Sequence, residues 1–160
     1  MADTKRVLFL CVGNSCRSQM AEGWLRHMAP DRFDAYSAGS MAAGLNPNAV
    51  TVMAEAGVDV SHQRSKRVDS LAQRRFDYVV TVCDAAHREC PVFVGQVGAR
   101  LHWPLEDPAE ATGSHDEVLR VFRRVRDQIE ARVEHFVAEE TAIGCSADRS
   151  TERKEAQEAS

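Results

Sequence analysis

The sequence predicts an α/β fold, organised as a single-domain three-layer sandwich around a four-stranded parallel sheet. Short apolar segments alternate along the chain with segments whose apolar residues recur at steps of three and four. This alternation is typical of strands joined by helical crossovers, which give parallel sheets covered on both faces. The first of these segments, VLFL at residues 7–10, is apolar without interruption, as in a strand buried on both faces. A chain of 160 residues suits one domain.

The first half of the chain contains two expected strands and two expected helices. Residues 7–10 (VLFL) form the first strand, and a glycine-bearing turn separates them from a helix with an apolar face over residues 20–28. Residues 33–36 are expected to form a short second strand. A second helix begins at Asn46-Pro47, because Asn is a good N-cap and Pro suits the first helical position.

The second half contains the clearest strand pattern and the longest helix. Residues 76–82 (FDYVVTV) are rich in β-branched and apolar side chains, and they end just before Cys83. Residues 100–103 are expected to form the last strand. A capping box that starts at Ser114 opens a helix whose apolar residues recur as far as Phe136.

The ends of the chain and its composition narrow the class of protein. Periodicity fades from about residue 138, so we expect residues 1–140 to form the domain and residues 141–160 a disordered tail. The N-terminal apolar run is too short for a signal peptide, and no run reaches the length of a membrane span. The net charge of −4 does not favour nucleic acid. We therefore expect a cytoplasmic monomer that binds neither nucleic acid nor membrane.

Cysteine is the residue type whose positions carry most information about function. An odd number of cysteines without export does not suggest a structural disulfide framework, and cytosolic cysteines are more often buried, metal-bound or catalytic. Cys11 and Cys83 each close an expected strand, and ligands of such sheets bind beyond the carboxyl ends of the strands. The fold therefore delivers two thiols to one rim. Cys16 is expected to be structural, and Cys145 receives no role.

The loop that follows the first strand has the composition of an oxyanion site. A loop entering a helix N-terminus directs free N–H groups at a common centre, and Gly13 permits unusual backbone conformations. Arg17 offers a planar fork for two oxygens of a tetrahedral anion. The helix end, Arg17 and the Ser18 hydroxyl would stabilise a nucleophilic thiolate at Cys11. The expected substrate-binding loop comprises Val12, Gly13, Asn14, Ser15, Cys16 and Arg17.

Two other interpretations of this loop deserve comparison. A buried cysteine in an ordinary strand–helix turn would need neither the arginine nor the serine at these positions. A nucleotide-binding loop would require a Gly-Lys-Ser/Thr sequence after Gly13, which the chain lacks. The placement and the flanking residues together favour an oxyanion site.

The segment FLCVGNSCRSQMAEGW closely resembles the opening of the low-molecular-weight tyrosine phosphatase superfamily, and most of all its arsenate reductases. The likeness continues through YSAG, Asn46-Pro47, residues 76–83 and the segment HWPLEDP, and it covers roughly residues 5 to 137. The resemblance implies the low-molecular-weight phosphatase fold, which is flavodoxin-like. It also implies that the loop binds arsenate.

The resemblance further assigns an acid and a thiol relay. Asp107, before Pro108, matches the residue that protonates the departing oxygen in both branches of the superfamily. Cys83 and Cys90 point to the reductase branch. They are separated by six residues, which is about two turns if the segment is helical and too far for a disulfide in a rigid helix. A disulfide between them therefore implies that the segment unwinds or loops. In the thioredoxin-coupled reductases the matching segment rearranges during turnover.

The chemistry gives a reason for three thiols. Reduction of arsenate to arsenite takes two electrons: Cys11 attacks arsenic, Cys83 attacks the Cys11 sulfur, and Cys90 moves the disulfide outward to thioredoxin. No bound cofactor is expected. Two unrelated buried cysteines, or a zinc site without close-pair spacing, are the weaker interpretations of Cys83 and Cys90.

Two other functions stay open from the sequence. A low-molecular-weight tyrosine phosphatase usually has aromatic residues after its Asp-Pro, whereas Ala109, Glu110 and Ala111 follow here. A non-catalytic oxyanion-binding or redox-sensing module would not need Asp107.

Some relatives also bind potassium beside the loop. Asn14, Glu22 and Ser37 match three of the potassium ligands, but Lys66 stands where the fourth, an Asp, is expected. We therefore expect no metal, with the Lys66 ammonium supplying the charge.

Overall fold

The computed structural model describes residues 4–83 and 91–145, with side chains described as far as residue 140. Cys90 lies outside the described residues, as do residues 146–160 of the expected tail. None of the helices in the described part of the chain is long and apolar enough to cross a membrane.

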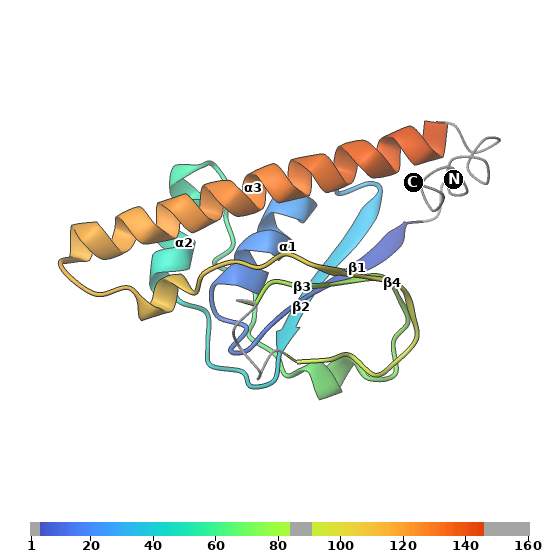
Figure 1. The fold of residues 1–160 in the computed structure, drawn as a ribbon, viewed down its shortest axis with the longest axis horizontal. Helices are drawn as coiled ribbons and strands as arrows, with labels where there is room; N and C mark the ends of the chain where they lie inside the picture. Colours follow the sequence, from blue (N-terminus) through green and yellow to red (C-terminus); the bar gives the residue numbers. More distant parts are fainter. Residues whose placement is uncertain (1–3, 84–90, 146–160) are drawn as a thin grey trace.

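Four parallel strands form the sheet, which confirms the predicted α/β fold. Their order is β2-β1-β3-β4 (Figure 1). The strands are β1 (Lys5–Cys11), β2 (Phe33–Gly39), β3 (Phe76–Thr81) and β4 (Val97–His102). Each overlaps the segment predicted for it. The strand β1 lies between β2, which follows it in the chain, and β3. The strand order therefore reverses at β1, and the carboxyl end of β1 is the topological switch point of the sheet.

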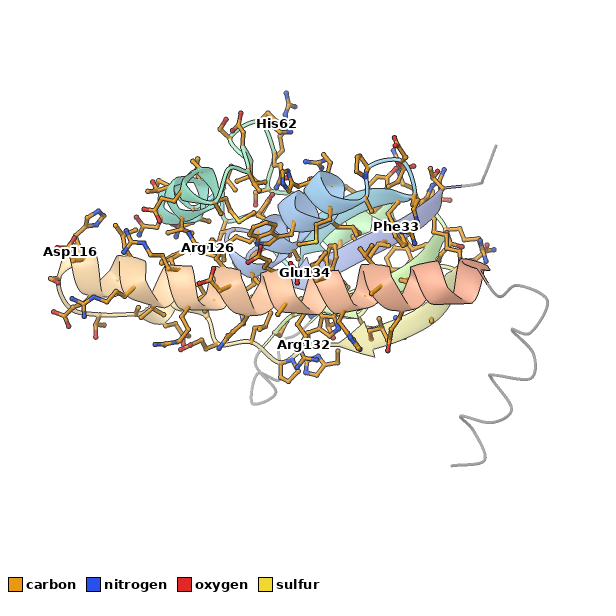
Figure 2. All side chains as sticks on the ribbon, turned by 90° about the horizontal axis from the view of Figure 1, so that it is seen from above. Phe33, His62, Asp116, Arg126, Arg132 and Glu134 are labelled. Carbon is orange, nitrogen blue, oxygen red and sulfur yellow. The ribbon has the colours of Figure 1, made fainter. Side chains whose placement is uncertain are left out.

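Three α-helices cover one face of this sheet. They are α1 (Arg17–Met28), α2 (Pro47–Glu55) and α3 (His115–Cys145). Both predicted helix starts are confirmed, since Asn46 Oδ1 accepts from Asn48 N at 2.8 Å and Ser114 Oγ accepts from Glu117 N at 3.1 Å. The helix α3 lies along the whole face, across α1 and α2 (Figures 1 and 2).

The second face has a thinner cover. A separate apolar cluster on this face joins residues of β1, β2 and β3 to Leu71 of the 3-10 helix η1 (Val68–Leu71) and to Phe93. The connection from β2 to β3 contributes to both faces, because α2 packs in the main core with α1 and α3 while Leu71 of η1 packs in this second cluster. Among the described residues, η1 and the segment around Phe93 form this layer in place of an α-helix.

The helix α3 is longer than its apolar periodicity predicts. It continues through residues 138–145, which the sequence pattern assigned to the end of the domain and the start of the tail. Side chains near its end contact the sheet: the Tyr78 hydroxyl donates to Glu140, and Lys5 Nζ lies 3.6 Å from Glu140 Oε1. Glu and Ala also have high helix propensity. Polar anchoring therefore extends the helix beyond the point where apolar contacts stop.

Two cysteines reach the same rim of the sheet, as the strand pattern predicts. Cys11 is the last residue of β1, and Cys83 follows β3 by two residues. The neighbouring strands stay paired up to this point, since Val82 N donates to Leu10 O at 2.8 Å. The Cys83 sulfur lies 3.9 Å from Leu10 O, beside the residue that precedes Cys11.

Candidate active site

The loop between β1 and α1 is fixed by backbone hydrogen bonds to the segment that follows β2. Met41 N donates to Val12 O at 3.0 Å, Ala43 N donates to Gly13 O at 2.9 Å, and Asn46 N donates to Ser15 O at 3.0 Å. These bonds engage carbonyl oxygens of the loop. Within the described part of the chain, the backbone N–H groups of residues 13–17 have no acceptor. A run of unpaired donors at a helix N-terminus is a cradle for an anion.

A pocket of about 210 Å³ lies at this cradle. It brings Cys11 and Arg17 of the loop together with Asp107, which is distant from them in sequence. The lining residues are Cys11, Val12, Gly13, Ser15, Cys16, Arg17, Ala43 and Asp107. All but one of these were expected from the sequence, and the missing one, Ala43, belongs to the segment that binds the loop.

A directed hydrogen-bond chain ends on the Cys11 sulfur. Asn14 Nδ2 donates to Ser18 Oγ at 2.8 Å, and Ser18 Oγ lies 2.9 Å from Cys11 Sγ. An amide nitrogen can only donate, so the Ser18 oxygen acts as its acceptor, and the Ser18 hydroxyl hydrogen stays available to a Cys11 thiolate. A hydroxyl directed at sulfur stabilises the thiolate, which is the nucleophilic form.

Asn14 holds this chain in place from a left-handed backbone conformation. Its φ angle is 48°, and it is fully buried. Asn tolerates this region better than most residues, because its short polar side chain can form local hydrogen bonds. Its Oδ1 accepts from Lys66 N at 2.7 Å and from Gln19 Nε2 at 3.1 Å. The side chain therefore uses both its donor and its acceptor to lock the loop.

A relay of buried amides continues from Asn14 to the far side of α1. Gln63 Nε2 donates to Gln19 Oε1 at 2.8 Å, and Arg26 Nη1 donates to Gln63 Oε1 at 2.8 Å. The same guanidinium forms a salt bridge with Glu22, whose other oxygen accepts from Ser37 Oγ at 2.5 Å. Sequence reasoning missed three members of this relay. Only Arg26 had a signal, namely its i,i+4 spacing from Glu22.

Lys66, expected to supply the charge of a potassium ion, shares the carboxylate of Glu22 with Arg26 in the structure. Burial lowers the pKa of Lys66, and the nearby Glu22 carboxylate opposes that change. The Lys66 ammonium donates to Arg64 O at 2.9 Å. Glu22 thus has two cations near it, Arg26 and Lys66. No group of three or more His, Cys, Asp and Glu side chains among the described residues could hold a metal ion.

Arg17 and Asp107 face each other across the pocket. Arg17 is buried, and its Nη1 donates to Leu105 O at 3.0 Å while Nη2 lies 3.6 Å from Asp107 Oδ2. Asp107 caps the 3-10 helix η2 (Pro108–Glu110), with Oδ1 accepting from Ala109 N at 3.0 Å. One carboxylate oxygen is therefore anchored and the other stays at the pocket. That arrangement suits a proton donor to a bound oxyanion.

Cys16 shares the pocket with Cys11 but has a different chemistry. Both are free thiols and almost fully buried. Burial raises the pKa of Cys16 to about 12, so this thiol stays protonated at neutral pH. A protonated thiol is a poor nucleophile. The structural role expected for Cys16 agrees with this environment.

Cys83 differs from both cysteines of the loop. It is fully buried and disulfide-bonded, whereas Cys11 and Cys16 are free. Cys90, the second thiol of the expected outer pair, is outside the described residues. Among the cysteines whose side chains are described, Cys11 and Cys16 are therefore free thiols in the pocket, and Cys83 is oxidised at the neighbouring strand end.

Comparisons with known proteins agree with this geometry. The family model of low molecular weight phosphotyrosine protein phosphatases matches residues 6–143. An arsenate reductase of Halalkalibacterium halodurans is 48% identical over 132 residues, which cover 82% of this chain and 94% of the relative. A solved arsenate reductase in its phosphate-binding state is 35% identical with a TM-score of 0.72, and the match covers 85% of this chain and 98% of the other.

A thioredoxin-dependent arsenate reductase of Corynebacterium glutamicum has the same fold. It is 28% identical with a TM-score of 0.63, and the match covers 86% of this chain and 62% of that one. The family match over residues 6–143 includes the loop, the strand ends and the segment of Asp107. The chain therefore belongs to the low molecular weight phosphotyrosine protein phosphatase family and, within it, to the arsenate reductases.

Proposed function

We propose that this protein reduces arsenate to arsenite in the cytoplasm, with Cys11 as nucleophile and thioredoxin as electron donor. One observation carries the proposal: the Cys11 sulfur lies 2.9 Å from the Ser18 hydroxyl oxygen, beside a run of unpaired backbone N–H groups. Nucleophile and anion site thus coincide. The relatedness to arsenate reductases, one of them thioredoxin-dependent, supports the substrate and the donor.

Binding places arsenic over the sulfur. The free N–H groups of residues 13–17 and the buried Arg17 guanidinium donate to three oxygens of the tetrahedral anion. The positive end of α1 adds to the field at the same point. These donors are fixed before the substrate arrives, so little reorganisation is needed when charge develops on the oxygens.

The first chemical step forms a bond between sulfur and arsenic. The Cys11 thiolate attacks arsenic, and Asp107 gives a proton to the oxygen opposite, which leaves as water. Asp107 is placed for this by its anchored oxygen and by its position at the pocket. The product is an arsenic(V) thioester-like adduct on Cys11, with no change yet in oxidation state.

The second step transfers two electrons. The Cys83 thiolate attacks the Cys11 sulfur, the sulfur–arsenic bond breaks, and its electron pair stays on arsenic, which departs as arsenite. Each of the two thiols has then lost one electron to the disulfide. Cys90 attacks Cys83 in turn, releasing Cys11 as a thiolate and forming the Cys83–Cys90 disulfide that thioredoxin reduces. The shared rim of Cys11 and Cys83 supports this order.

Phosphatase chemistry shares the first step but is not favoured as the main activity. No aromatic side chain is among the residues that line the pocket in the described part of the chain, so an aryl ring has no surface on which to stack. A small oxyanion needs none.

One assay tests the proposal. Arsenate-dependent NADPH oxidation is measured with thioredoxin and thioredoxin reductase, in parallel with hydrolysis of an aryl phosphate. We expect sustained oxidation at micromolar enzyme and only slow hydrolysis. Fast hydrolysis with no arsenate-dependent oxidation would contradict the proposal and favour a phosphatase.

A further inference from the structure

The segment after Cys90 presents two large apolar side chains to solvent. Val92 is 68% exposed and Val94 is 87% exposed, and only Met41 joins them as an exposed large hydrophobic residue in the described part of the chain. Pro91 and Phe93 alternate with them and are buried. We call residues 91–94 the 91–94 strip. Its alternation of buried and exposed side chains is that of an extended strand with one face uncovered.

The strip is firmly anchored from below. The Phe93 ring packs edge-on against Phe76, with ring centroids 5.2 Å apart, and it is 1% exposed. Arg100 Nη2 donates to Phe93 O at 2.8 Å. A side chain on Gly95 would come within 2.5 Å of the Phe93 ring, so glycine at this position permits the packing. Because the anchor fixes the backbone, the two valines are held outward rather than free to fold back.

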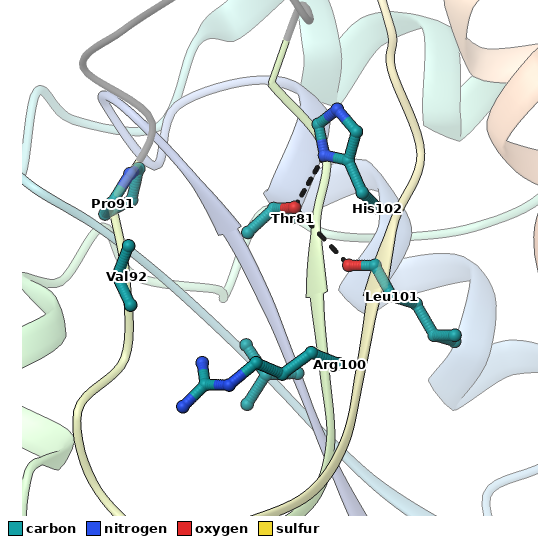
Figure 3. Close-up of a pocket in the computed structure, with 7 residues that line it drawn as sticks. Thr81, Pro91, Val92, Arg100, Leu101 and His102 are labelled. Carbon is teal, nitrogen blue, oxygen red and sulfur yellow. Dashed lines mark hydrogen bonds between the residues drawn. The ribbon is translucent and has the colours of Figure 1, made fainter.

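The strip also has open hydrogen-bonding groups and an adjacent groove. The backbones of Val92 and Val94 form no hydrogen bond with other described residues. Beside them lies a pocket of about 230 Å³, bounded by Pro91 and Val92 on one side and by β3 and β4 on the other (Figure 3). Its rim carries His102, whose Nδ1 lies 2.6 Å from Thr81 Oγ1.

We propose that the 91–94 strip and this groove form the docking surface for the dithiol protein that reduces the outer disulfide, with thioredoxin as the probe. This inference rests on the proposed function, because it takes Cys90 as the last thiol of the relay. Pro91 directly follows Cys90 in the chain. A thiolate that attacks the Cys90 sulfur must come within bonding distance of it. Any protein that carries this thiolate therefore covers the residues next in sequence.

The surface fits a protein and offers nothing to a small thiol. An extended segment with free backbone N–H and C=O groups can form main-chain hydrogen bonds with an extended segment of a partner. Its exposed side chains then make apolar contacts with the partner's surface. Exposed apolar residues rimmed by polar ones are typical of interaction sites. A small thiol would need neither the valines nor the backbone groups. The strip is thus expected to set the rate of reduction by a protein and leave reduction by a small thiol unchanged.

The exchange at this surface is balanced. One thiolate of the partner attacks the Cys90 sulfur, forming a mixed disulfide and releasing Cys83, which takes up a proton. The second thiol of the partner then attacks its own bonded sulfur, releasing Cys90 as a thiol. The partner leaves as a disulfide, having given up two electrons.

The test measures reduction directly, without arsenate. Oxidised protein, with its disulfide mapped by mass spectrometry, is mixed with reduced thioredoxin or with dithiothreitol, and the rate constants are compared. For Val92→Asn/Val94→Asn we expect the thioredoxin rate constant to fall about tenfold, the size expected for losing apolar contacts at an interface centre. The dithiothreitol rate constant should not change. Both side chains are exposed, so Tm should stay close to that of the wild type.

A matched variant and three outcomes complete the test. Val92→Ile/Val94→Ile keeps the apolar surface and should keep the wild-type thioredoxin rate. An Asn variant as fast as the wild type with thioredoxin would overturn the docking surface, as would equal losses with thioredoxin and dithiothreitol. If the wild type reduces no arsenate while the Asn variant is still selectively slow with thioredoxin, the proposed function fails and the docking surface stands.

Discussion

The anion loop of residues 11–18 and the 91–94 strip serve opposite ends of the proposed electron path, and they are built in opposite ways. In the loop, the side chains of Asn14, Arg17 and Ser18 are buried and hydrogen-bonded, and the backbone N–H groups of residues 13–17 have no acceptor among the described residues. In the strip, two apolar side chains and their backbone groups are left uncovered. The loop is proposed to bind a small charged substrate, and the strip is proposed to receive a protein.

The difference follows from what each region must recognise. A fixed set of donors stabilises a small anion because the protein has already met the free-energy cost of orienting them. A protein partner brings its own extended surface, so the receiving segment keeps its backbone groups available. Rigidity is common to both: Asn14 locks the loop, and Phe93 anchors the strip.

Substitution of the relay thiols should produce the largest effects and break the path at different places. Cys11→Ser should lower arsenite release by at least about 10³-fold, as expected for loss of a nucleophile. Cys83→Ser should also release no arsenite but keep aryl-phosphate cleavage, which needs only the loop and Asp107. Cys90→Ser should release at most one arsenite per enzyme and accumulate a Cys11–Cys83 disulfide. Mass mapping after thiol blocking measures this, and multiple turnover by Cys83→Ser with thioredoxin would refute the relay.

Alkylation should separate the two thiols of the loop itself. Iodoacetamide at pH 7 should modify Cys11 at least about 100-fold faster than Cys16, because only the thiolate reacts and Cys16 stays protonated. The Cys16 pKa is raised from 9.0 to about 12. Its stabilising contribution as a buried neutral thiol is therefore complete below pH 9 and is lost as pH rises towards 12.

The control for this experiment is anion protection. Arsenate, phosphate or sulfate should slow alkylation of Cys11 by occupying the cradle, whereas Cys16 should react slowly with or without the anion because its thiol stays protonated. Peptide mapping after a timed reaction gives both rates. Equal rates for the two cysteines, or no protection by any anion, would remove the main support for the loop as an activated oxyanion site.

Substitution of Asn14 tests whether hydrogen bonding or backbone strain fixes the loop. Asn14→Gly keeps access to φ 48° but removes every side-chain bond, whereas Asn14→Ala adds strain as well. We expect KM for arsenate to rise about tenfold in Asn14→Gly, since Ser18 loses the amide that orients its hydroxyl. Asn14→Ala should be less stable than Asn14→Gly by about 1 kcal/mol in urea unfolding. An unchanged KM in Asn14→Gly would show that the Ser18 hydroxyl does not need the Asn14 amide for its orientation.

Local sequence patterns predicted most of the secondary structure and the loop that forms one side of the candidate active site. The strands, the helix caps at Asn46 and Ser114 and the sequence of the loop are each encoded within a few residues. The length of α3 was not, because Glu140 is anchored by Tyr78 and Lys5, which lie far away in the sequence.

The amide relay shows the same limit within the site. Gln19 and Gln63 are 44 residues apart and meet only after α1 packs against the segment before β3. A glutamine has no sequence signal for such a role, because most glutamines are solvated. The meeting of Cys11 with Asp107 could be inferred only through the resemblance, whereas the shared rim of Cys11 and Cys83 followed from strand topology.

The smallest expected effect concerns the cation beside Glu22. Arg26 and Lys66 already supply positive charge to this buried carboxylate, so a further cation gains little. Activity and Tm should differ by less than about 1.5-fold and about 1 °C between potassium and tetramethylammonium salts at equal ionic strength, since both salts screen equally. Lys66→Asp adds a carboxylate near Asn14 and Glu22 and removes a competing ammonium, so it should create a potassium-specific gain. The gain should stay modest, because Arg26 still pairs with Glu22, and it should increase in Lys66→Asp/Arg26→Gln. A clear potassium-specific gain in the wild type would mean that neither side chain neutralises the site, and the charge beside the loop would then have to come from solution.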